Sequence, residues 1–458
     1  MNDGIFCSGQ AAIFRLVAEA IADMAPSCGF TGPDLPARDI YDQCVRCGLC
    51  LPTCPTYVET LVETSSPRGR IALIKAVSEG HLDITSPGFV HQMSECLDCR
   101  ACEAVCPSGV EYGQLLETAR TQVQRALGKR APWHVRMLRT ITIGGLFRNY
   151  RLMRVAAALL RFYQRSGLQA LLRRSGLLKA LKLADLEALT PPISTRFFIP
   201  RDQHWASHAE RRATVFMHVG CIMHVAFADV NAATVRMMQR VGCDVIAPST
   251  QGCCGAIAVH AGELESGREL AKRNIIAFEQ SKADFYLINA AGCGSTLKEY
   301  GRLFEEVPEW RERAARFSAA VRDITEFLDA MGLPPGMGWK EMVVTYQEPC
   351  HLVHAQRISA APRHLLNQIP GLILREMAES SLCCGSAGIY NITEPEMAQQ
   401  LQRRKIENAL RVEPEIIVTA NPGCALQLAS GLRAAGRNIE VKHIVELLDE
   451  AYARAEAS

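Results

Sequence analysis

Eight cysteines in two runs of one layout have the clearest chemistry in this chain. The runs are Cys44-x-x-Cys47-x-x-Cys50-x-x-x-Cys54-Pro55 and Cys96-x-x-Cys99-x-x-Cys102-x-x-x-Cys106-Pro107. Three thiolates on one tight loop can each bond a different iron of a [4Fe–4S] cube, and the fourth cysteine of such a run usually ligates the other cube. A zinc knuckle needs neither the third cysteine nor the proline. The spacing therefore predicts iron–sulfur clusters rather than zinc.

We predict two [4Fe–4S] clusters whose fourth ligands are exchanged. Cluster 1 takes Cys44, Cys47, Cys50 and Cys106, and cluster 2 takes Cys96, Cys99, Cys102 and Cys54. The exchange places the cubes close enough for rapid electron transfer, so we expect an electron carrier. Residues 40–125 form this predicted two-cluster domain, whose long connection between the runs predicts helices around the cluster loops. Arg68 and Arg70, where one such helix opens, could tune a cluster potential or meet a partner, but we expect them to be solvated.

Eight further cysteines in the second half form an internal repeat. The first copy has Cys221, Cys253, Cys254 and Cys293, and the second has Cys350, Cys383, Cys384 and Cys424. Corresponding cysteines are 129, 130 or 131 residues apart, and a glycine follows each adjacent pair. Such regular offsets indicate a duplicated domain, which we place at residues 201–335 and 336–458.

Each copy alternates apolar, strand-like runs with helical stretches. Residues 215–221 and 343–350 end in the first cysteine of each copy, and residues 285–293 and 416–424 end in the last. This alternation is typical of an α/β unit with a largely parallel sheet, in which ligands bind beyond the carboxyl ends of the strands. We therefore expect each cysteine set to gather at that edge.

Adjacent cysteines suit a polynuclear cluster better than a single tetrahedral ion, because neighbouring thiolates can bond different irons. Gly255 and Gly385 then allow close backbone approach. Two alternatives stay open at this point: buried, inert cysteines, or a redox-active disulfide between the adjacent pair.

A strongly basic segment separates the two cysteine regions. From Thr118 to Ala184 there is no Asp or Glu, whereas fifteen Lys or Arg residues occur. On a helical wheel, arginines fall on one flank and Leu152, Val155, Leu159 and Phe162 on another. Such a helix, in a predicted linker over residues 126–200, fits either a lipid surface or an acidic partner subunit. The predicted contact residues are Arg148, Arg151, Arg154, Arg161, Arg165, Arg173 and Arg174. We do not expect nucleic acid as a partner, because no nucleic-acid motif accompanies the charges.

Composition and termini complete the prediction. The 458 residues are 48% apolar with a formal net charge of +2, so several cores are expected and no generic polyanion binding. The N-terminus lacks the marks of a signal peptide, and no apolar run could cross a bilayer. We expect a cytoplasmic protein, peripheral on the inner face of the cytoplasmic membrane. Residues 1–39 are predicted as a helical extension, with an amphipathic helix over residues 8–25 flanked by Cys7 and Cys28, which lack ligand spacing.

The repeat resembles the duplicated cysteine-rich domain of heterodisulfide reductases. Together with the two N-terminal runs, the chain is similar to the iron–sulfur subunit of bacterial glycolate oxidase. The matching stretches are Cys44–Gly48, Cys54–Tyr57, Pro67–Ile71, Cys106–Val110, Gly252–Ala256, Gly292–Gly294, Leu382–Gly388 and Val418–Cys424.

This resemblance implies a multidomain chain in which an α-helical two-[4Fe–4S] ferredoxin-like domain precedes a duplicated α/β cysteine-rich domain. It also implies an electron-transfer subunit that serves a flavoprotein dehydrogenase acting on a 2-hydroxy acid and delivers electrons toward the quinone pool. We expect no flavin in this chain, because the G-x-G-x-x-G turn is missing. Substrate chemistry would then lie in the partner, with no catalytic residue here. Alternatives are the iron–sulfur subunit of a lactate or glycerol-3-phosphate dehydrogenase, or a thiol/disulfide reductase.

One departure concerns the end of each copy. The heterodisulfide reductase pattern closes with C-x-x-C, whereas Cys293 and Cys424 stand alone. Each copy therefore supplies fewer thiolates than that pattern, which leaves open a four-thiolate cluster, a partly water-ligated cluster, or no cluster in one copy. His224, His351 and His354 lie near the cysteines and are candidates for a replacement ligand or a proton donor.

Overall fold

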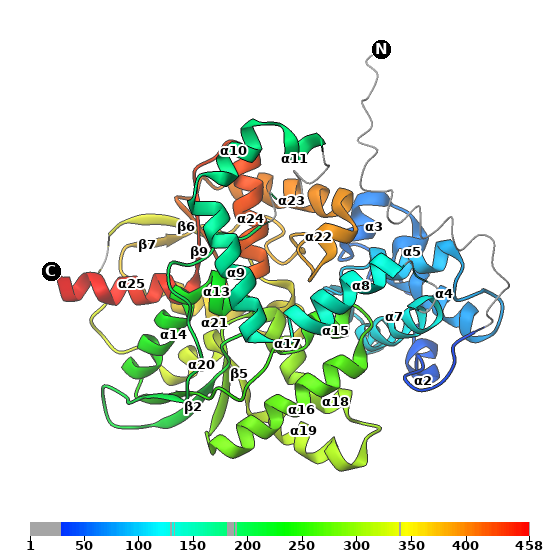
Figure 1. Cartoon of the computed structure of the whole chain (residues 1–458), viewed down its shortest axis with the longest axis horizontal. Coiled ribbons are helices and arrows are strands. Elements are labelled where there is room, and N and C mark those ends of the chain that lie inside the picture. Colours follow the sequence, from blue (N-terminus) through cyan, green and yellow to red (C-terminus); the bar gives the residue numbers. More distant parts are fainter. Residues whose placement is uncertain are drawn as a thin grey trace.

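The computed structural model describes residues 29–457 except 129, 130, 132, 181–186, 188, 189 and 339. The predicted helix at residues 8–25 and both Cys7 and Cys28 lie outside the described residues. Figure 1 shows a helical N-terminal unit beside two units that contain the strands. The predicted order, a helical iron–sulfur part followed by a duplicated α/β part, is confirmed.

The N-terminal unit is built from short helices around one apolar core. They are α2 (Arg38–Asp42), α3 (Pro55–Thr60), η1 (Glu63–Ser65), α4 (Pro67–Ser78), α5 (Pro87–Glu95), α6 (Ala101–Ala104) and α7 (Tyr112–Gly128). Three of them begin with proline, whose fixed φ suits the first helical position and whose missing N–H is not needed there. Ile74, Phe89 and Leu115 are fully buried in the core. The helices hold both cysteine runs as loops at their ends.

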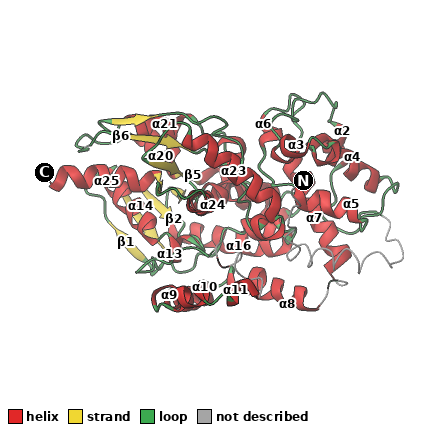
Figure 2. Cartoon of the chain, turned by 90° about the horizontal axis from the view of Figure 1, so that it is seen from above, coloured by secondary structure: helices red, strands yellow, loops and turns green. Residues whose placement is uncertain are grey.

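The basic segment forms α8 (Trp133–Ile141), η2 (Thr142–Leu146), α9 (Tyr150–Arg165), α10 (Leu168–Arg174) and α11 (Leu177–Ala180). The Asn149 side chain caps α9 by accepting hydrogen bonds from the first backbone amides of the helix. Tyr150, Met153 and Ala157 are buried against the first α/β unit. Figure 2 shows α8 to α10 along one side of the molecule.

The first α/β unit has a five-stranded sheet in the order β1-β3-β2-β4-β5, parallel except for β1. Its elements are β1 (Gln203–Trp205), β2 (Ala213–Met217), α13 (Met223–Ala226), α14 (Ala228–Arg240), β3 (Cys243–Ala247), α15 (Ala256–His260), α16 (Leu264–Ser281), β4 (Phe285–Ile288), α17 (Ala291–Lys298), α18 (Tyr300–Leu303), α19 (Pro308–Ala320), β5 (Val321–Asp323) and α20 (Ile324–Met331).

The second unit repeats this plan without the edge strand, in the order β7-β6-β8-β9, all parallel. Its elements are β6 (Met342–Tyr346), η3 (His351–Ala355), α21 (Ala360–Asn367), β7 (Leu372–Leu374), α22 (Tyr390–Thr393), α23 (Pro395–Leu410), β8 (Ile416–Thr419), α24 (Pro422–Ala434), β9 (Glu440–His443) and α25 (Ile444–Ala457). Strands β3-β2-β4-β5 and β7-β6-β8-β9 occupy the same positions, which matches the largely parallel sheet predicted for each copy.

The two α/β units pack reciprocally. The last helix of each unit contacts the first long helix of the other, α20 against α21 and α25 against α14. Arg236 on α14 forms an ion pair of 2.6 Å with Asp449 on α25. One apolar core runs through both sheets, including the fully buried Val215 and Val344. The two copies therefore form one packed body, in which each copy has its own cysteine-bearing sheet edge, rather than two separate domains joined by a linker.

The glycine after each cysteine pair lies against a helix, as predicted for close approach. Gly385 has φ of +87°, and a Cβ there would lie 2.5 Å from the backbone oxygen of Ala398 on α23. Gly255 has φ of +84° and faces Gly267 on α16. The left-handed backbone favours glycine at both positions, and at Gly385 the close contact also excludes a Cβ. Each Cys-Cys pair is thereby held against the helix that follows it.

Candidate iron–sulfur centres

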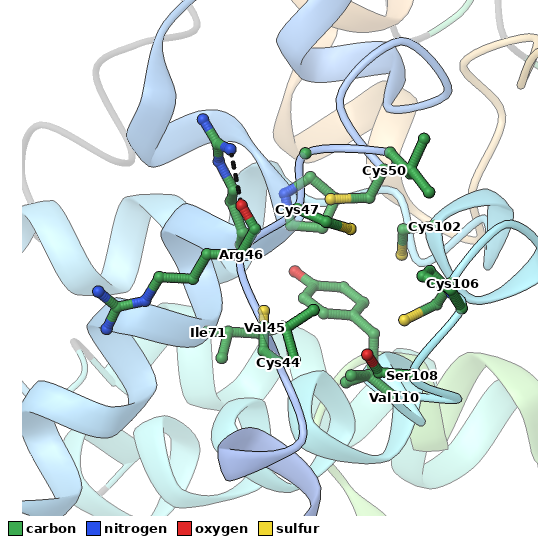
Figure 3. Close-up of a pocket in the computed structure, with 16 residues that line it drawn as sticks. Cys44, Val45, Arg46, Cys47, Cys50, Ile71, Cys102, Cys106, Ser108 and Val110 are labelled. Atoms are coloured by element: carbon green, nitrogen blue, oxygen red, sulfur yellow. Dashed lines mark hydrogen bonds between the residues drawn. The ribbon is translucent and has the colours of Figure 1, made fainter.

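The predicted ligands of cluster 1 surround one cavity. Cys44, Cys47, Cys50 and Cys106 line a space of about 430 Å³ between the first cysteine loop and the loop before α7 (Figure 3). The Cys47 side chain is exposed and the other three are partly buried. Arg68 spans the rim, donating to the backbone oxygen of Arg46 at 3.1 Å and pairing with Glu63 at 2.7 Å. This site is close to the protein surface.

The predicted ligands of cluster 2 surround a neighbouring cavity. Cys54, Cys96, Cys99 and Cys102 line about 300 Å³ and are all buried. Pro67, Cys102 and Tyr112 line both cavities, so little material separates them. The linings separate the two predicted sets except at Cys102, which lines both cavities, and the assignment of each thiolate to one cluster stays a prediction.

Arg70 was missed as a site residue, and the expectation that it is solvated is wrong. Its side chain is fully buried and lines the second cavity. It pairs with Glu95 at 2.8 Å and donates to Thr56 Oγ1 at 3.0 Å. Burial opposes its charge, but nearby Cys96 and other acidic groups hold the pKa of Arg70 above its usual value. Helical periodicity indicates this burial in the sequence, because Arg70 shares one face of α4 with the apolar residues Ile74 and Val77.

The cysteines of the second copy meet at the carboxyl edge of its sheet. Cys350 follows β6, Cys424 lies in the first turn of α24 after β8, and the Cys350 and Cys383 sulfurs are 3.9 Å apart. Hydrogen bonds from the thiols of Cys383 and Cys424 lower the pKa of Cys384, and the charge of Lys405 acts in the same direction. Lys405 is buried on α23 and donates to the Ser380 backbone oxygen at 3.1 Å. This set therefore has a buried cation beside it.

The second copy also lies against cluster 2 of the N-terminal unit. Leu97, Cys99, Cys383 and Tyr390 pack in one apolar group, with Cys350 at its edge. The Tyr390 hydroxyl donates to the Glu95 backbone oxygen at 2.7 Å. Candidate centres of different domains therefore adjoin.

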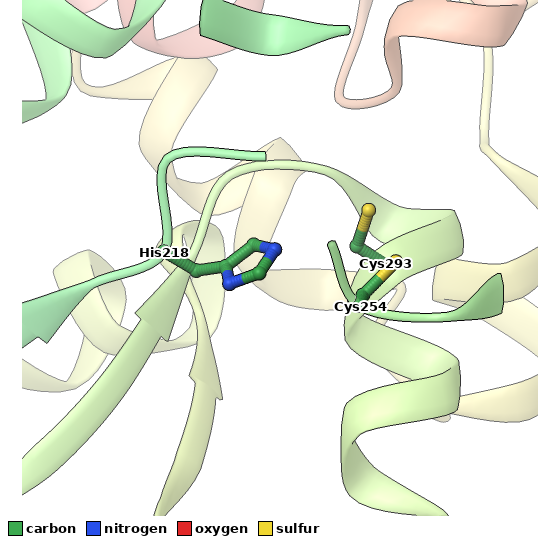
Figure 4. Close-up of side chains that lie close together, drawn as sticks. All are labelled: His218, Cys254 and Cys293. Carbon is green, nitrogen blue, oxygen red and sulfur yellow. The ribbon is translucent and has the colours of Figure 1, made fainter. Parts of the chain in front are cut away.

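The first copy gathers its cysteines at the corresponding edge, under α9. Cys253 contacts the thiols of Cys221 and Cys254, and Cys254 contacts Cys293. Cys221, Cys253 and Cys254 are buried. Tyr150 of α9 closes the site by donating to the Gly252 backbone oxygen at 2.8 Å. His218 also points into this set (Figure 4).

The two copies touch next to their last cysteines. The backbone N–H of Ala291 donates to the Ala420 oxygen at 3.2 Å, and that of Gly292 donates to Asn421 Oδ1 at 3.1 Å. These residues directly precede Cys293 and Cys424. The four cysteine sets thus follow one another through the molecule, from the exposed loop of Cys47 to the edge beneath α9.

Comparison with known protein families matches most of these regions. The model of a 4Fe-4S dicluster domain matches residues 40–110, and that of a cysteine-rich domain matches residues 215–298 and 344–429. The model of the glycolate oxidase iron-sulfur subunit linker region matches residues 134–190. The probable glycolate oxidase iron-sulfur subunit of Bacillus subtilis (strain 168) is 42% identical over 417 residues, which cover 89% of this chain and 93% of that protein. This chain belongs to the family of glycolate oxidase iron–sulfur subunits.

Two further relatives fit this membership. The glycolate oxidase iron-sulfur subunit of Escherichia coli (strain K12) is 33% identical over 91% of this chain and 95% of its own length. Lactate utilization protein A of Oceanobacillus iheyensis is 31% identical over 51% of this chain and 96% of its own length. The chain is therefore an iron–sulfur subunit of a dehydrogenase complex, and its N-terminal cysteines hold [4Fe–4S] clusters.

The histidines that the sequence suggested contact backbone oxygens. His351 Nε2 lies 2.9 Å from the Asp98 oxygen, His354 Nε2 lies 3.0 Å from the Ser381 oxygen, and His224 Nδ1 lies 2.9 Å from the Gly220 oxygen. The histidine that the structure brings to a cysteine set is instead His218, which the sequence analysis did not single out. Its signal was the spacing His218-x-x-Cys221.

The predicted basic contact residues divide into two groups. Arg148 pairs with Glu269, Arg173 pairs with Glu187 at 3.0 Å, and Arg161 donates to the Thr195 backbone oxygen at 2.7 Å. These three are engaged within the chain. Arg151, Arg165 and Arg174 are exposed and Arg154 is partly buried. For these four, contact with a membrane or a partner stays a prediction.

A buried ionic network joins the N-terminal unit to the first copy. Arg100 pairs at 2.8 Å with both Asp98 and Glu117, Arg302 of the first copy pairs with Glu117 at 2.8 Å, and His260 Nδ1 lies 2.9 Å from Asp98. Burial opposes the His260 charge, but Asp98 and Glu117 raise its pKa to about 9. Because two arginines already neutralise these carboxylates, we interpret the group as an ionic junction rather than a metal site.

The Tyr112 hydroxyl donates to Cys96 Sγ at 3.6 Å, which predicts an effect on cluster 2. A hydrogen bond to a cluster thiolate favours the reduced cluster and raises its potential. Tyr112→Phe should therefore lower one cluster potential by roughly 20–60 mV, from a net hydrogen-bond energy of about 0.5–1.5 kcal/mol. EPR-monitored redox titration measures it. The control Tyr41→Phe removes a hydrogen bond between Tyr41 and Ser78, which is not a cluster ligand, so the cluster potential should not change. Equal potentials in Tyr112→Phe and the native protein would contradict the assignment.

The His260 network predicts a pH-dependent stability. His260 has a folded-state pKa of about 9 against an ordinary 6.5, so its charge stabilises the fold fully below about pH 6.5 and ceases to do so as the pH rises through about 9. His260→Gln should cost about 2–3 kcal/mol near pH 6.5 and much less at pH 9.5. Thermal unfolding of the cluster-loaded protein at both pH values measures this. The control His81→Gln removes an exposed histidine and should leave both midpoints unchanged. If the destabilisation caused by His260→Gln were the same at both pH values, the charged state of His260 would be refuted.

Proposed function

We propose that this chain relays electrons from a flavoprotein that oxidises a 2-hydroxy acid, with glycolate favoured, toward the quinone pool. Family membership establishes an iron–sulfur subunit of a dehydrogenase complex, and the names of the relatives favour glycolate over lactate or glycerol 3-phosphate. The observation that carries the proposal is the continuity of the four cysteine sets. Each set adjoins the next through shared lining residues, a shared apolar group or direct backbone hydrogen bonds.

The exposed loop of cluster 1 supports electron entry from a partner. Cys47 is exposed, and the neighbouring Val45 and Leu49 side chains are 69% and 56% exposed. A small apolar surface next to a redox centre suits the limited interfaces of electron-transfer complexes. We infer that the flavoprotein docks over this loop.

Burial argues against the alternative of a thiol/disulfide reductase. Both Cys-Cys pairs are at most 3% exposed, so a protein disulfide cannot reach them without rearrangement. The same burial suits an electron relay, in which protein excludes solvent from the centres.

The test uses the complex that co-purifies with the chain under anaerobic conditions. Cys99→Ser removes a ligand of cluster 2 and should reduce glycolate-driven reduction of a soluble quinone to the level of the flavoprotein alone, while glycolate still bleaches the flavin. The control Cys243→Ala changes a buried cysteine at the amino end of β3, away from the cysteine sets, and should keep quinone reduction. Undiminished quinone reduction in Cys99→Ser would overturn the relay. Lactate and glycerol 3-phosphate, assayed in parallel, test the substrate, and reduction of a disulfide instead of quinone would favour the reductase.

We also propose that α9 attaches the chain to the membrane surface. Leu152, Val155, Leu159 and Phe162 lie along one face of α9 and are 50–68% exposed. Exposed Leu171 on α10 extends the apolar surface, and Arg151 and Arg165 lie beside it. Among the described residues no helix is long and apolar enough to span a bilayer. An apolar face bordered by arginines matches a helix that lies in the lipid interface.

Vesicle flotation tests this attachment. Vesicles with anionic lipid should carry the native protein, whereas Leu159→Glu with Phe162→Glu should reduce the bound fraction at least tenfold, because two charges replace side chains that enter the acyl region. Ile392→Glu, an exposed apolar residue on α22, is the matched control. Unchanged flotation of the α9 variant would overturn membrane attachment, and loss of a co-purifying subunit instead would assign the face to subunit docking.

A further inference from the structure

His218 in the first copy has a buried ring nitrogen that no described group satisfies. The residue follows β2 and is fully buried. Its Nδ1 lies 2.7 Å from the Tyr286 hydroxyl, whereas its Nε2 has no hydrogen-bond partner among the described residues. An unsatisfied buried polar atom costs about 1–3 kcal/mol. His224 Nε2 is unsatisfied as well, but among the described residues it is His218 that lies with two cysteines.

The free nitrogen faces two thiols. The donor atoms of His218, Cys254 and Cys293 all lie within 4.8 Å of one another, as Figure 4 shows. Imidazole and thiolate together suit iron, zinc and iron–sulfur clusters. The three side chains come from different segments of the first copy, after β2, before α15 and in α17, so the fold rather than a local motif assembles them.

The orientation of the His218 ring suits coordination, because Tyr286 holds the nitrogen on the other side. If Nδ1 carries the proton and donates to Tyr286, the lone pair of Nε2 is directed at the thiols. Metal-binding histidines are commonly oriented in this way by a hydrogen bond from the other ring nitrogen.

The second copy has no such residue. Its position equivalent to His218, counted from the first cysteine, is Gln347. The Gln347 amide is satisfied, because Oε1 accepts from Thr419 at 2.8 Å and Nε2 donates to the Glu348 backbone oxygen at 2.6 Å. The position of Tyr286, counted from the last cysteine, holds Ile417. The histidine and its orienting tyrosine are therefore peculiar to the first copy.

The second copy instead has a buried charge. Gly255 contacts Gly267 on α16, and Gly385 contacts Ala398 on α23. When the two helices are aligned on these contacts, Lys405 of α23 is equivalent to Asn274 of α16. Lys405 places an ammonium beside the thiols of the second copy. Asn274 is neutral and donates to the Cys253 backbone oxygen at 3.0 Å. One copy thus offers an additional ligand and the other an additional positive charge.

We propose that His218 Nε2 is a metal ligand in the first copy, beside the thiolates of Cys254 and Cys293, so that the two copies hold differently ligated centres. The centre of the first copy has mixed imidazole and thiolate ligation, and that of the second copy is held by thiolates next to Lys405. This inference rests on the proposed relay only in that the first copy binds an iron–sulfur cluster.

Pulsed EPR on the native, cluster-loaded chain tests the ligand directly. With the protein poised so that the centre is paramagnetic, a directly bound imidazole gives a strong ¹⁴N coupling, and ¹⁵N-histidine labelling identifies its source. We expect this coupling in the native protein and in His224→Gln, a buried histidine of the same copy that is outside the three-residue group. His218→Gln, which installs the residue of the second copy, should lose it. His218→Cys should retain the iron of the native protein without the nitrogen coupling.

The outcomes separate this proposal from the relay. A coupling that persists in His218→Gln, or none in a native protein whose first copy contains iron, would overturn histidine ligation while leaving the relay intact. An iron content of only about eight per chain, which two [4Fe–4S] clusters explain, would remove the premise and overturn the inference. Stoichiometric zinc in the first copy would do the same. Because the native spectrum and the metal analysis need no variant, a His218 variant that fails to fold does not prevent the test.

Discussion

The buried ionic network of Asp98, Arg100, Glu117, His260 and Arg302 fixes how the N-terminal unit meets the first copy. Charges removed from water are costly unless each finds a partner, and here His260 and Arg302 of the first copy pair with Asp98 and Glu117 of the N-terminal unit. Separating the units would leave several buried charges unpaired at once, so one docking geometry is strongly preferred. Asp98 and Arg100 flank Cys99, and His351 of the second copy forms a hydrogen bond with the Asp98 backbone oxygen, so the second copy meets the N-terminal unit beside the same network. Electron transfer depends on such constant separations.

The two copies share one backbone plan, but different elements cover their cysteine edges. Strand order, the glycine after the cysteine pair and the reciprocal helix contacts are the same in both copies. However, cluster 2 covers the cysteine edge of the second copy, whereas α9 covers that of the first. Once the edges had different neighbours, the residues next to the cysteines were free to diverge. Lys405 and His218 show this divergence at the level of single side chains.

The sequence predicted what short-range spacing controls. The repeated offsets predicted two largely parallel sheets with cysteines at one edge, and the cysteine spacing predicted ligand sets whose assignment stays a prediction. It did not predict which side chains from distant segments would meet. Arg70 looked solvated because its buried partner Glu95 lies on another helix, and His218 escaped notice because its thiol neighbours come from later loops. The apolar flank of α9 was visible on a helical wheel, but only the structure shows that Met153 and Ala157 supply the buried face and leave that flank exposed.

Burial and charge vary together along the four cysteine sets. Cluster 1 lies near solvent, which screens its negative charge, and its nearby Arg68 is paired at the rim with Glu63. Cluster 2 and the second copy are buried, and each has a buried basic side chain beside it: Arg70, which is paired with Glu95, or Lys405, whose pKa burial lowers. The low dielectric screens these side chains less than water screens Arg68, so they act more strongly on the adjacent centre. The first copy lies at the far end of the proposed relay beneath α9, and there the neutral Asn274 stands at the position of Lys405.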